Sequence, residues 1–317
     1  MSNDNSHAKH HKQYPTVICI MGPTASGKTA LAIETAKALN GEVVSVDSAL
    51  IYRDMNIGTA KPDVEEMAGI RHWLMDICSP EESYSVADFR KDAIAAIEDI
   101  VARGKTPILA GGTMMYFNAL VNGISEVPPS EKSMRQHVKS LIEDKGLASV
   151  HQMLCEVDAA SAAKIHPNDM QRTSRAMEVF LSTGKPLSFW QNKKHAEPPF
   201  NFTQFCIMPE DRETLHKRIA KRFEQMLDTG LVDEVRYLLK KYELHLDLPS
   251  LRSVGYRQVY AYLTNEYSYE EMRERGVIAT RQLAKRQITW LRAWSDVIAL
   301  RTGDESNLRQ VLQKLGA

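Results

Sequence analysis

The chain has 317 residues, of which 43% are hydrophobic, and its acidic and basic side chains balance to a formal net charge of zero. A chain of this length can bury a large core in one or two domains. Zero net charge excludes a global electrostatic argument for binding nucleic acid, so any such argument must be local. The sequence contains no run of about 18 apolar residues, which excludes a membrane-spanning helix.

The polar start of the chain, residues 1–14, lacks the apolar segment of a signal peptide, so we expect a disordered tail there. The cysteines, Cys19, Cys78, Cys155 and Cys206, are far apart and form no C-x-x-C pair, which argues against zinc sites and disulfides. This cysteine usage is typical of a reducing compartment, and we expect a cytoplasmic protein.

A phosphate-binding loop follows the first predicted strand. Residues 16–21 are apolar and β-branched, and residues 28–40 carry a helical pattern. Between them stands a complete G-x-x-x-x-G-K-T motif, formed by Gly22, Pro23, Thr24, Ala25, Ser26, Gly27, Lys28 and Thr29. In such a loop backbone N–H groups surround phosphate oxygens, and the helix N-terminus adds partial positive charge. Lys28 adds a mobile cation, and the Thr29 hydroxyl can ligate Mg²⁺. The motif therefore predicts phosphate or diphosphate binding.

The next segments continue the alternation of strand and helix. Residues 41–46 and 106–110 read as strands, and residues 86–103 read as an amphipathic helix. This β-α-β pattern predicts a P-loop NTPase-like core, with a mostly parallel sheet flanked by helices. Ligands collect at the carboxyl ends of such strands. The phosphate-binding loop, Asp47-Ser48 and Gly111-Gly112-Thr113 all follow predicted strands there.

The pattern changes after Val127-Pro128-Pro129. Residues 131–190 are helical with no strand signal, residues 202–208 read as a strand, and the chain is largely helical from Asp211 to a last strand near 297–300. We predict a core formed by residues 15–124 and 201–317, with an all-helical domain inserted at residues 125–200.

Two residues after the second strand admit more than one interpretation. Asp47 could ligate Mg²⁺, act as a general base for an acceptor nucleophile, or merely cap a helix at the end of the strand. Lys61, in the turn Gly58 to Pro62, could reach a phosphate or could be a solvated loop lysine.

Several motifs, in order along residues 15–294, resemble the tRNA dimethylallyltransferase (tRNA isopentenyltransferase) family, bacterial type without a zinc finger. They are the phosphate-binding loop; Asp47-Ser48 with Tyr52-Arg53; Ile57 to Pro62; Gly111-Gly112-Thr113 with Tyr116; His166 to Asp169 with Gln171, Arg172 and Arg175; Val254 to Gln258; and Thr280 to Gln287. A small departure is Trp73, where a second histidine is common in the family.

The resemblance implies transfer of a dimethylallyl group from dimethylallyl diphosphate to N6 of the adenosine at position 37, 3′ of the anticodon, in tRNAs that read codons beginning with U. It implies Mg²⁺ as cofactor and the tRNA anticodon stem-loop as partner. Asp47 is then the expected general base, Thr113 lies near the reacting centre, and Lys28 stabilises the leaving diphosphate. We expect Thr29 as a metal ligand and the protein as a monomer without membrane association.

The resemblance also implies a set of tRNA contacts. They are expected at Asp47, Ser48, Ala49, Leu50, Thr113, Arg135, Gln171, Arg172, Thr173, Ser174, Arg175, Arg252, Ser253, Val254, Gly255, Tyr256 and Arg257. Arg252 or Arg257 could also neutralise phosphate. Arg281, Lys285 and Arg292 share one helical face and could form an electrostatic footprint for RNA, or could be a solvated surface. We expect Trp290 and Trp294 to pack beneath the last helix rather than to stack on RNA.

Three other functions share parts of this pattern. An adenylate isopentenyltransferase would have the same phosphate-binding loop and Asp47, but would need no arginine-rich helical insertion. A small-molecule P-loop kinase would leave the middle motifs unexplained. A GTPase-like switch would need an N-K-x-D motif, which the chain lacks.

Overall fold

The computed structural model describes residues 14–125, 127–192 and 199–317. The chain divides into two compact units, residues 1–121 with 198–317 and residues 122–197, which we call the core unit and the helical unit. Apart from Tyr14, the predicted tail lies outside the described residues.

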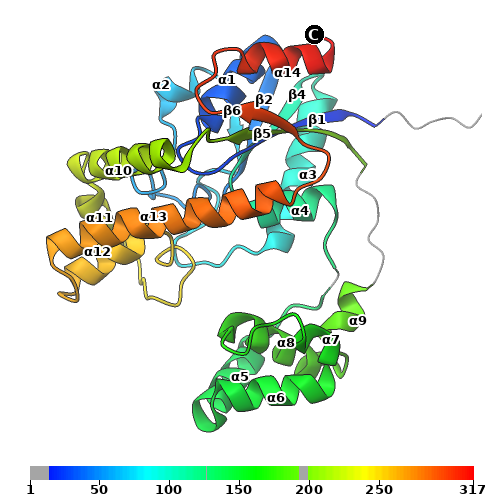
Figure 1. Cartoon of the computed structure of the whole chain (residues 1–317), viewed down its shortest axis with the longest axis vertical. Coiled ribbons are helices and arrows are strands. Elements are labelled where there is room, and N and C mark those ends of the chain that lie inside the picture. The colour runs from blue at the N-terminus through cyan, green and yellow to red at the C-terminus, as the bar shows by residue number, and fades with distance from the viewer. Residues whose placement is uncertain (1–13, 126, 193–198) are drawn as a thin grey trace, which may run out of the picture. The chain divides into compact units, whose positions relative to one another are not determined.

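The core unit is built on a six-stranded sheet in the order β3-β2-β4-β1-β5-β6, with every adjacent pair parallel (Figure 1). This confirms the predicted parallel sheet flanked by helices. The strands are β1 Thr16–Met21, β2 Gly41–Val46, β3 His72–Trp73, β4 Thr106–Gly111, β5 Asn201–Met208 and β6 Ile298–Arg301.

The edge strand β3 was not predicted, because two residues carry no periodic signal. It pairs with Val43 and Val44 of β2. The Trp73 indole donates a 2.8 Å hydrogen bond to Glu42, a buried carboxylate that also accepts from Arg103 and Lys105. Hydrogen bonds from Arg103 hold the pKa of Glu42 far below its usual range, against the effect of burial.

Helices surround the sheet and extend the core unit at one end. The helices of the core unit are α1 Lys28–Ala38, α2 Val64–Met67, α3 Val86–Ala102, α4 Met114–Val121, α10 Arg212–Asp228, α11 Leu231–Lys241, α12 Tyr256–Leu263, α13 Tyr269–Arg292 and α14 Asn307–Leu315. The helical unit contains α5 Lys132–Lys145, α6 Leu147–Val157, α7 Ala159–Ala162, α8 Met170–Thr183 and α9 Leu187–Gln191. In the described ranges no helix has the length and apolar character needed to cross a membrane.

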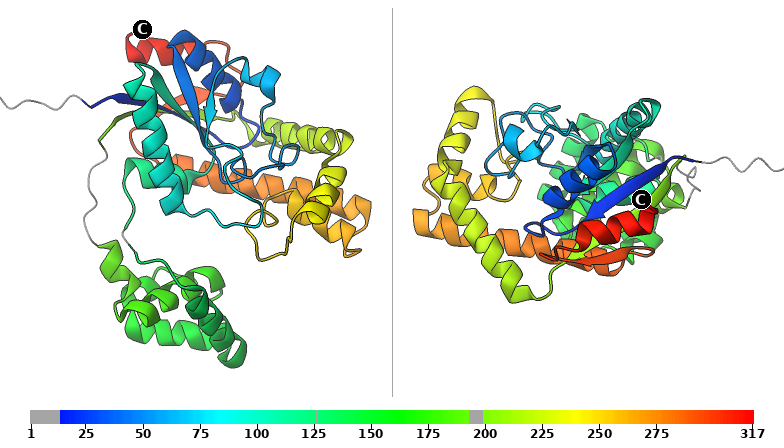
Figure 2. Two further views of the ribbon diagram at one scale, coloured as in Figure 1. Left: turned by 180° about the vertical axis from the view of Figure 1, so that it is seen from behind. Right: turned by 90° about the horizontal axis from the view of Figure 1, so that it is seen from above.

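Two apolar layers cover the two faces of the sheet, because side chains alternate along each strand. In β1, Cys19 and Met21 belong to the cluster that includes Phe89 of α3, whereas Ile18 and Ile20 belong to the cluster with α1 and α14. Helix α3 therefore covers one face of the sheet, and α1 and α14 cover the other (Figure 2). The four cysteines are free thiols, as predicted.

Three strands end at the same level of the sheet, and this register positions the site. Met21 of β1 and Val46 of β2 are both paired with Gly111 of β4. A Cβ atom at Gly111 would lie 2.0 Å from the Val46 carbonyl oxygen, so only glycine allows this close approach. The segments that follow β1, β2 and β4 therefore begin side by side.

Candidate active site

The loop of residues 22–29 has the conformation of a phosphate-binding loop. Gly27 has φ 89°, a left-handed conformation that favours glycine, and α1 begins directly after it. A Cβ atom at Gly22 would lie 2.6 Å from Ser26 Oγ, so the loop closes tightly there. The Ser26 hydroxyl is buried without a hydrogen-bond partner in the described part of the chain. A buried orphaned donor inside this loop fits a site that is completed by an anion.

Lys28 stands at the start of α1 with its ammonium group turned back into the loop. Its Nζ donates a 3.2 Å hydrogen bond to the Pro23 carbonyl oxygen. Burial lowers the pKa of Lys28 to about 8, the negative charge of Asp47 acts in the opposite direction, and the positive charge of Arg222 lowers the pKa further. A bound diphosphate would replace the weak carbonyl partner with a full negative charge.

Asp47 and Thr113 lie beside this loop at the ends of β2 and β4. Asp47 Oδ1 accepts a 2.9 Å hydrogen bond from Ala49 N, which fixes the carboxylate in a local turn. Thr113 N donates to Val46 O at 3.2 Å, and Thr113 Oγ1 accepts from Ser48 N at 3.0 Å. A turn rather than a helix follows Asp47, so the helix cap considered from the sequence is wrong; the contact with Ala49 N uses one carboxylate oxygen. The other oxygen has no hydrogen-bond partner among the described residues and remains able to accept a proton or ligate a metal.

Arg222 of α10 is a further cation near this site, and it was not predicted from the sequence. Burial lowers its pKa, and the charges of Asp47 and Glu66 act in the opposite direction. Arg222 therefore interacts electrostatically with both Asp47 and Lys28. No sequence signal separates Arg222 from the other cations of α10, because only the tertiary fold brings its charge near Asp47 and Lys28.

Lys61, by contrast, has a structural role. Its Nζ donates to Tyr52 O at 2.8 Å and to Asp76 Oδ1 at 2.5 Å, and only 5% of its side chain is exposed. Lys61 is therefore not a solvated loop lysine, because its charge is paired with Asp76; a phosphate contact stays a prediction. It ties the turn after β2 to the segment that follows β3.

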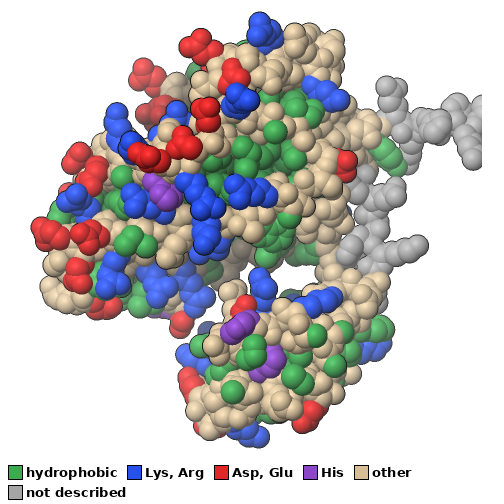
Figure 3. Space-filling view, in the orientation of Figure 1, with side chains coloured by type: hydrophobic (Ala, Val, Ile, Leu, Met, Phe, Trp, Pro, Cys, Tyr) green, Lys and Arg blue, Asp and Glu red, His purple; other side chains and the backbone are tan. Residues whose placement is uncertain are grey.

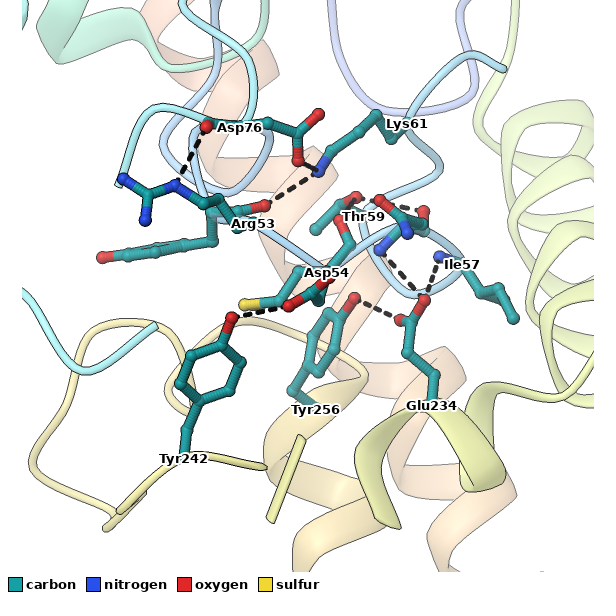
Figure 4. Close-up of polar contacts among 12 residues, drawn as sticks. Arg53, Asp54, Ile57, Thr59, Lys61, Asp76, Glu234, Tyr242 and Tyr256 are labelled. Atoms are coloured by element: carbon teal, nitrogen blue, oxygen red, sulfur yellow. Dashed lines mark hydrogen bonds and ion pairs between the residues drawn. The ribbon is translucent and has the colours of Figure 1, made fainter. Parts of the chain in front are cut away.

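A single carboxylate organises the turn that contains Lys61 (Figure 4). Glu234 of α11 accepts hydrogen bonds from three consecutive backbone N–H groups, those of Asn56, Ile57 and Gly58, at 2.9, 2.7 and 3.1 Å. Its Oε1 also accepts a 2.6 Å hydrogen bond from the Tyr256 hydroxyl. These contacts join the motif around Gly58 to the motif around Tyr256 in one packed junction.

The expected tRNA contacts of the core unit differ in exposure. Ser48 is exposed, Ala49 and Leu50 are half-buried, and Arg257 is exposed on α12. Arg252 is exposed but pairs with Asp247 at 3.2 Å. Ser253 and Val254 are half-buried, whereas Gly255 and Tyr256 are buried. The Tyr256 side chain is therefore part of the framework, and the exposed members are the ones that can touch a partner.

The expected tRNA contacts of the helical unit, on α5 and α8, also differ in exposure. Arg135, Gln171 and Arg172 are exposed, and Ser174 is half-buried. Thr173 is fully buried, so its side chain faces the interior of the unit. The guanidinium of Arg175 donates to Ser130 Oγ and to Pro128 O, which ties α8 to the segment before α5. Burial lowers the pKa of Arg175, Glu178 raises it, and Arg135 lowers it further, so the two arginines are close in space.

Comparisons with known proteins show the family of this chain. The model of the IPP transferase family matches residues 50–294. The chain is similar to the full-length tRNA isopentenylpyrophosphate transferase of Bacillus halodurans, with 34% identity over 96% of both chains and a TM-score of 0.71. It is also similar to the tRNA delta(2)-isopentenylpyrophosphate transferase of Staphylococcus epidermidis, with 37% identity over 95% of this chain and 97% of that chain and a TM-score of 0.67.

A third similar structure is a eukaryotic dimethylallyltransferase acting on tRNA, with 29% identity over 95% of this chain and 77% of that chain and a TM-score of 0.78. The chain belongs to the IPP transferase family. The resemblance drawn from the sequence motifs is thereby confirmed, and the protein is an enzyme, a prenyltransferase of this family.

In this IPP transferase the basic face of α13 is only partly exposed. Lys285 and Arg292 are exposed, but Arg281 is half-buried with its Nε atom buried and unpaired within the described residues. Lys and Arg side chains gather over α10 and α13 on the face seen in Figure 3. Arg281 is therefore not a simple solvated surface residue.

The prediction for Trp290 was wrong. Its side chain is 43% exposed on α13, whereas Trp294 is half-buried, packs against the core cluster and donates a 2.8 Å hydrogen bond to Gln204. Periodicity placed both residues on one face, but α13 ends at Arg292, so Trp294 lies beyond the helix and follows a different path.

Proposed function

We propose that this enzyme transfers a dimethylallyl group from dimethylallyl diphosphate to N6 of the adenosine at position 37 of tRNAs that read codons beginning with U. The observation that carries the proposal is the common register of β1, β2 and β4, whose ends bring the phosphate-binding loop beside Asp47 and Thr113. A donor diphosphate and an acceptor amine need adjacent sites of this kind.

The donor diphosphate is assigned to residues 22–29. Loop N–H groups, Lys28 and the buried Ser26 hydroxyl would bind its oxygens, and Arg222 would add a second cation. Charge on the diphosphate grows as the bond between its oxygen and the prenyl C1 breaks. Cations that are already in place at that point stabilise the transition state more than the bound substrate.

The acceptor is assigned to the side of Asp47 and Thr113. In the reaction a bond forms between adenine N6 and the prenyl C1, the C1–O bond breaks, and diphosphate leaves with the electron pair. N6 loses a proton, and Asp47 is the proposed acceptor of that proton. The proposal is supported by the turn that holds Asp47 Oδ1 on Ala49 N and by the neighbouring Thr113 hydroxyl.

Mg²⁺ is the proposed cofactor. Thr29 would supply a hydroxyl ligand, and oxygen donors of this kind, together with diphosphate oxygens, are the set that Mg²⁺ prefers. Among the described residues the Ser26 hydroxyl has no hydrogen-bond partner and Lys28 has no ion-pair partner, which fits a bound diphosphate with its metal. When bound, the ion would neutralise charge on the leaving group. Because Thr29 already offers a ligand, we assign Asp47 to the acceptor rather than to the metal.

The anticodon stem-loop is the proposed macromolecular partner. The exposed residues Arg135, Gln171 and Arg172 of the helical unit, with Ser48 and Arg257 of the core unit, can donate to phosphates or base edges. The target adenosine must leave its stack to react, which costs a few kcal/mol and requires such contacts in compensation. We also propose that the enzyme is a cytoplasmic monomer.

One assay tests the proposal directly. Labelled dimethylallyl diphosphate is offered with tRNA, with AMP or with ATP, and the products are digested to nucleosides and identified by mass. Label in N6-dimethylallyladenosine from tRNA is expected, and a tRNA with guanosine at position 37 should accept none. Label in AMP or ATP but not in tRNA would instead show an adenylate prenyltransferase.

A second version of this assay tests the codon rule. Unmodified tRNAs that read codons beginning with U are compared with tRNAs that carry adenosine 37 but read other codons. Preferential labelling of the first group is expected. Equal labelling of both groups would contradict the codon specificity while leaving prenyl transfer intact.

A further inference from the structure

One amide side chain joins the two halves of the proposed reaction site. Gln287 of α13 accepts a 2.9 Å hydrogen bond at Oε1 from Thr24 N in the phosphate-binding loop. Its Nε2 donates a 2.9 Å hydrogen bond to Gly112 O in the turn after β4. The partners lie 263 and 175 residues away in the sequence, so this contact exists only in the folded chain.

Gly112 is shaped for this contact. A Cβ atom there would lie 2.4 Å from Gln287 Nε2 and 3.1 Å from the Gly22 carbonyl oxygen. Any larger residue would displace the amide or push the turn away from the phosphate-binding loop. Glycine at this position therefore allows three segments of the chain to meet. The close approach, and not an unusual φ angle, is the reason that the position requires glycine.

Packing fixes the stretch of α13 that carries Gln287. Ala284 and Leu291, one turn before and one turn after it, are buried. The neighbouring Ile288 packs against a cluster that contains Ala284 and is shared with Ala25 of the phosphate-binding loop. The amide thus extends from a fixed stretch of helix, which a flexible surface glutamine would not do.

The chemistry of the contact also requires an amide. Thr24 presents an N–H donor and Gly112 presents a carbonyl acceptor, so the bridging group must both accept and donate. Glutamine has both functions, whereas an ionised glutamate only accepts and lysine only donates. The residue that follows Gly112 is Thr113, which accepts from Ser48 N next to Asp47.

We propose that Gln287 is a positioning residue that sets the separation between the loop for the donor diphosphate and the turn that carries the acceptor side of the site. This inference rests on the proposed function. Gln287 does not touch the reacting atoms; it acts through Thr24 and through Gly112-Thr113. Loss of the amide would leave each substrate site formed but would let the two move relative to each other.

The test compares Gln287→Met and Gln287→Glu with Gln225→Met, an exposed glutamine of α10, as the matched control. Single-turnover prenyl transfer is measured with tRNA and dimethylallyl diphosphate both saturating, and the Kd of each substrate is measured separately. Misplacement by about 1 Å can cost on the order of 10²-fold in rate. We expect Gln287→Met to lose roughly 10- to 100-fold in single-turnover rate while each Kd changes much less.

The glutamate variant adds a readout that a purely structural role would not give. At high pH its carboxylate faces the Gly112 carbonyl without a proton to donate, and protonation at lower pH restores a donor. The ratio of the Gln287→Glu rate to the wild-type rate should therefore rise as pH falls. The ratio is used because any pH effect that is common to both enzymes cancels in it.

The outcomes separate the inference from the proposed function. A wild-type enzyme that prenylates no tRNA would overturn the proposed function and, with it, the positioning role. A Gln287→Met variant that reacts at the wild-type rate would overturn the positioning role alone. So would a rate loss that is fully explained by weaker binding of one substrate.

Discussion

The hydroxyl of Tyr256 donates a 2.6 Å hydrogen bond to Glu234 Oε1, and the same carboxylate binds three consecutive backbone N–H groups of residues 56–58. This pair joins α11, α12 and the turn after β2. Because the turn leads back to Tyr52 through Lys61, the junction supports the segment that begins at Asp47.

The junction yields a prediction on stability. Tyr256→Phe leaves Glu234 with one donor fewer and should reduce the free energy of unfolding by about 1–3 kcal/mol. Gly58→Ala would place a Cβ atom 2.5 Å from Tyr256 Cε2 and should cost about 1–3 kcal/mol by overpacking. Urea unfolding measures both effects. Tyr269→Phe, on a ring that is 41% exposed, should change little; an equal loss there would contradict the assigned role of the hydrogen bond.

Lys28 leads to a prediction on pH. Burial lowers its pKa to about 8 in the free protein, so its ammonium loses the proton as pH rises through about 8. Diphosphate binds the protonated form and raises this pKa, so binding takes up a proton above pH 8. Affinity for dimethylallyl diphosphate should fall by up to about tenfold per pH unit there.

Calorimetric titration with dimethylallyl diphosphate, without tRNA, measures this dependence. Lys28→Arg is the matched variant, because a guanidinium stays charged over the whole range. Its affinity should be nearly independent of pH. If Lys28→Arg showed the same decline as the wild type, the titrating group would not be Lys28.

Arg222 should contribute strongly to transfer. Removal of one preorganised cation that stabilises a leaving diphosphate costs on the order of 10²-fold or more in kcat/KM. Arg222→Gln is therefore expected to lose about 10²-fold, measured by steady-state prenylation of tRNA. Lys221→Gln, the exposed neighbour on α10, is the control and should stay near the wild-type rate. Similar losses in both variants would point to a general charge effect instead.

Asp47→Asn distinguishes the general base from a metal ligand. If Asp47 is the general base, Asp47→Asn should lower the rate roughly 10²–10⁴-fold, while the diphosphate with Mg²⁺ still binds. As a metal ligand, its replacement should instead raise the Mg²⁺ concentration that half-maximal activity requires. Titration of Mg²⁺ against the variant measures this. Full recovery of the rate at high Mg²⁺ would overturn the assignment to the acceptor.

The helical unit leads to a prediction on salt dependence. If Arg135 and Arg172 contact phosphates, each change to Gln should lower the slope of log Kd for tRNA against log salt by about one. Arg175→Gln should change the slope less and destabilise the unit more, because its guanidinium already binds Ser130 and Pro128. Lys145→Gln at the far end of α5 is the control. Unchanged slopes for the Arg135 and Arg172 variants would show that these side chains are solvated surface residues and not phosphate contacts.

The parts of the fold and of the site that could be predicted are those that short stretches of sequence specify. Residues 16–29 specify a strand, a tight turn and a helix start through near neighbours alone. Strands β1, β2, β4 and β5 are largely apolar and largely buried, as is typical of a parallel sheet covered on both faces. The phosphate-binding loop, Asp47 and Thr113 were therefore found without a structure. Their common edge of the sheet followed from the parallel topology, because strand ends meet there.

The remaining part of the site depends on contacts between distant segments. Gln287 bridges partners far away in the chain, and a single neutral amide on a helix has no periodic signal that would mark it. Arg222 looks like any other cation of α10 until burial brings its charge near Asp47 and Lys28. Lys61 could not be assigned because its partner, Asp76, lies in another loop. Sequence by itself determined which residue types are present at each strand end; tertiary packing decided which cations are paired within the protein and which are left for a ligand.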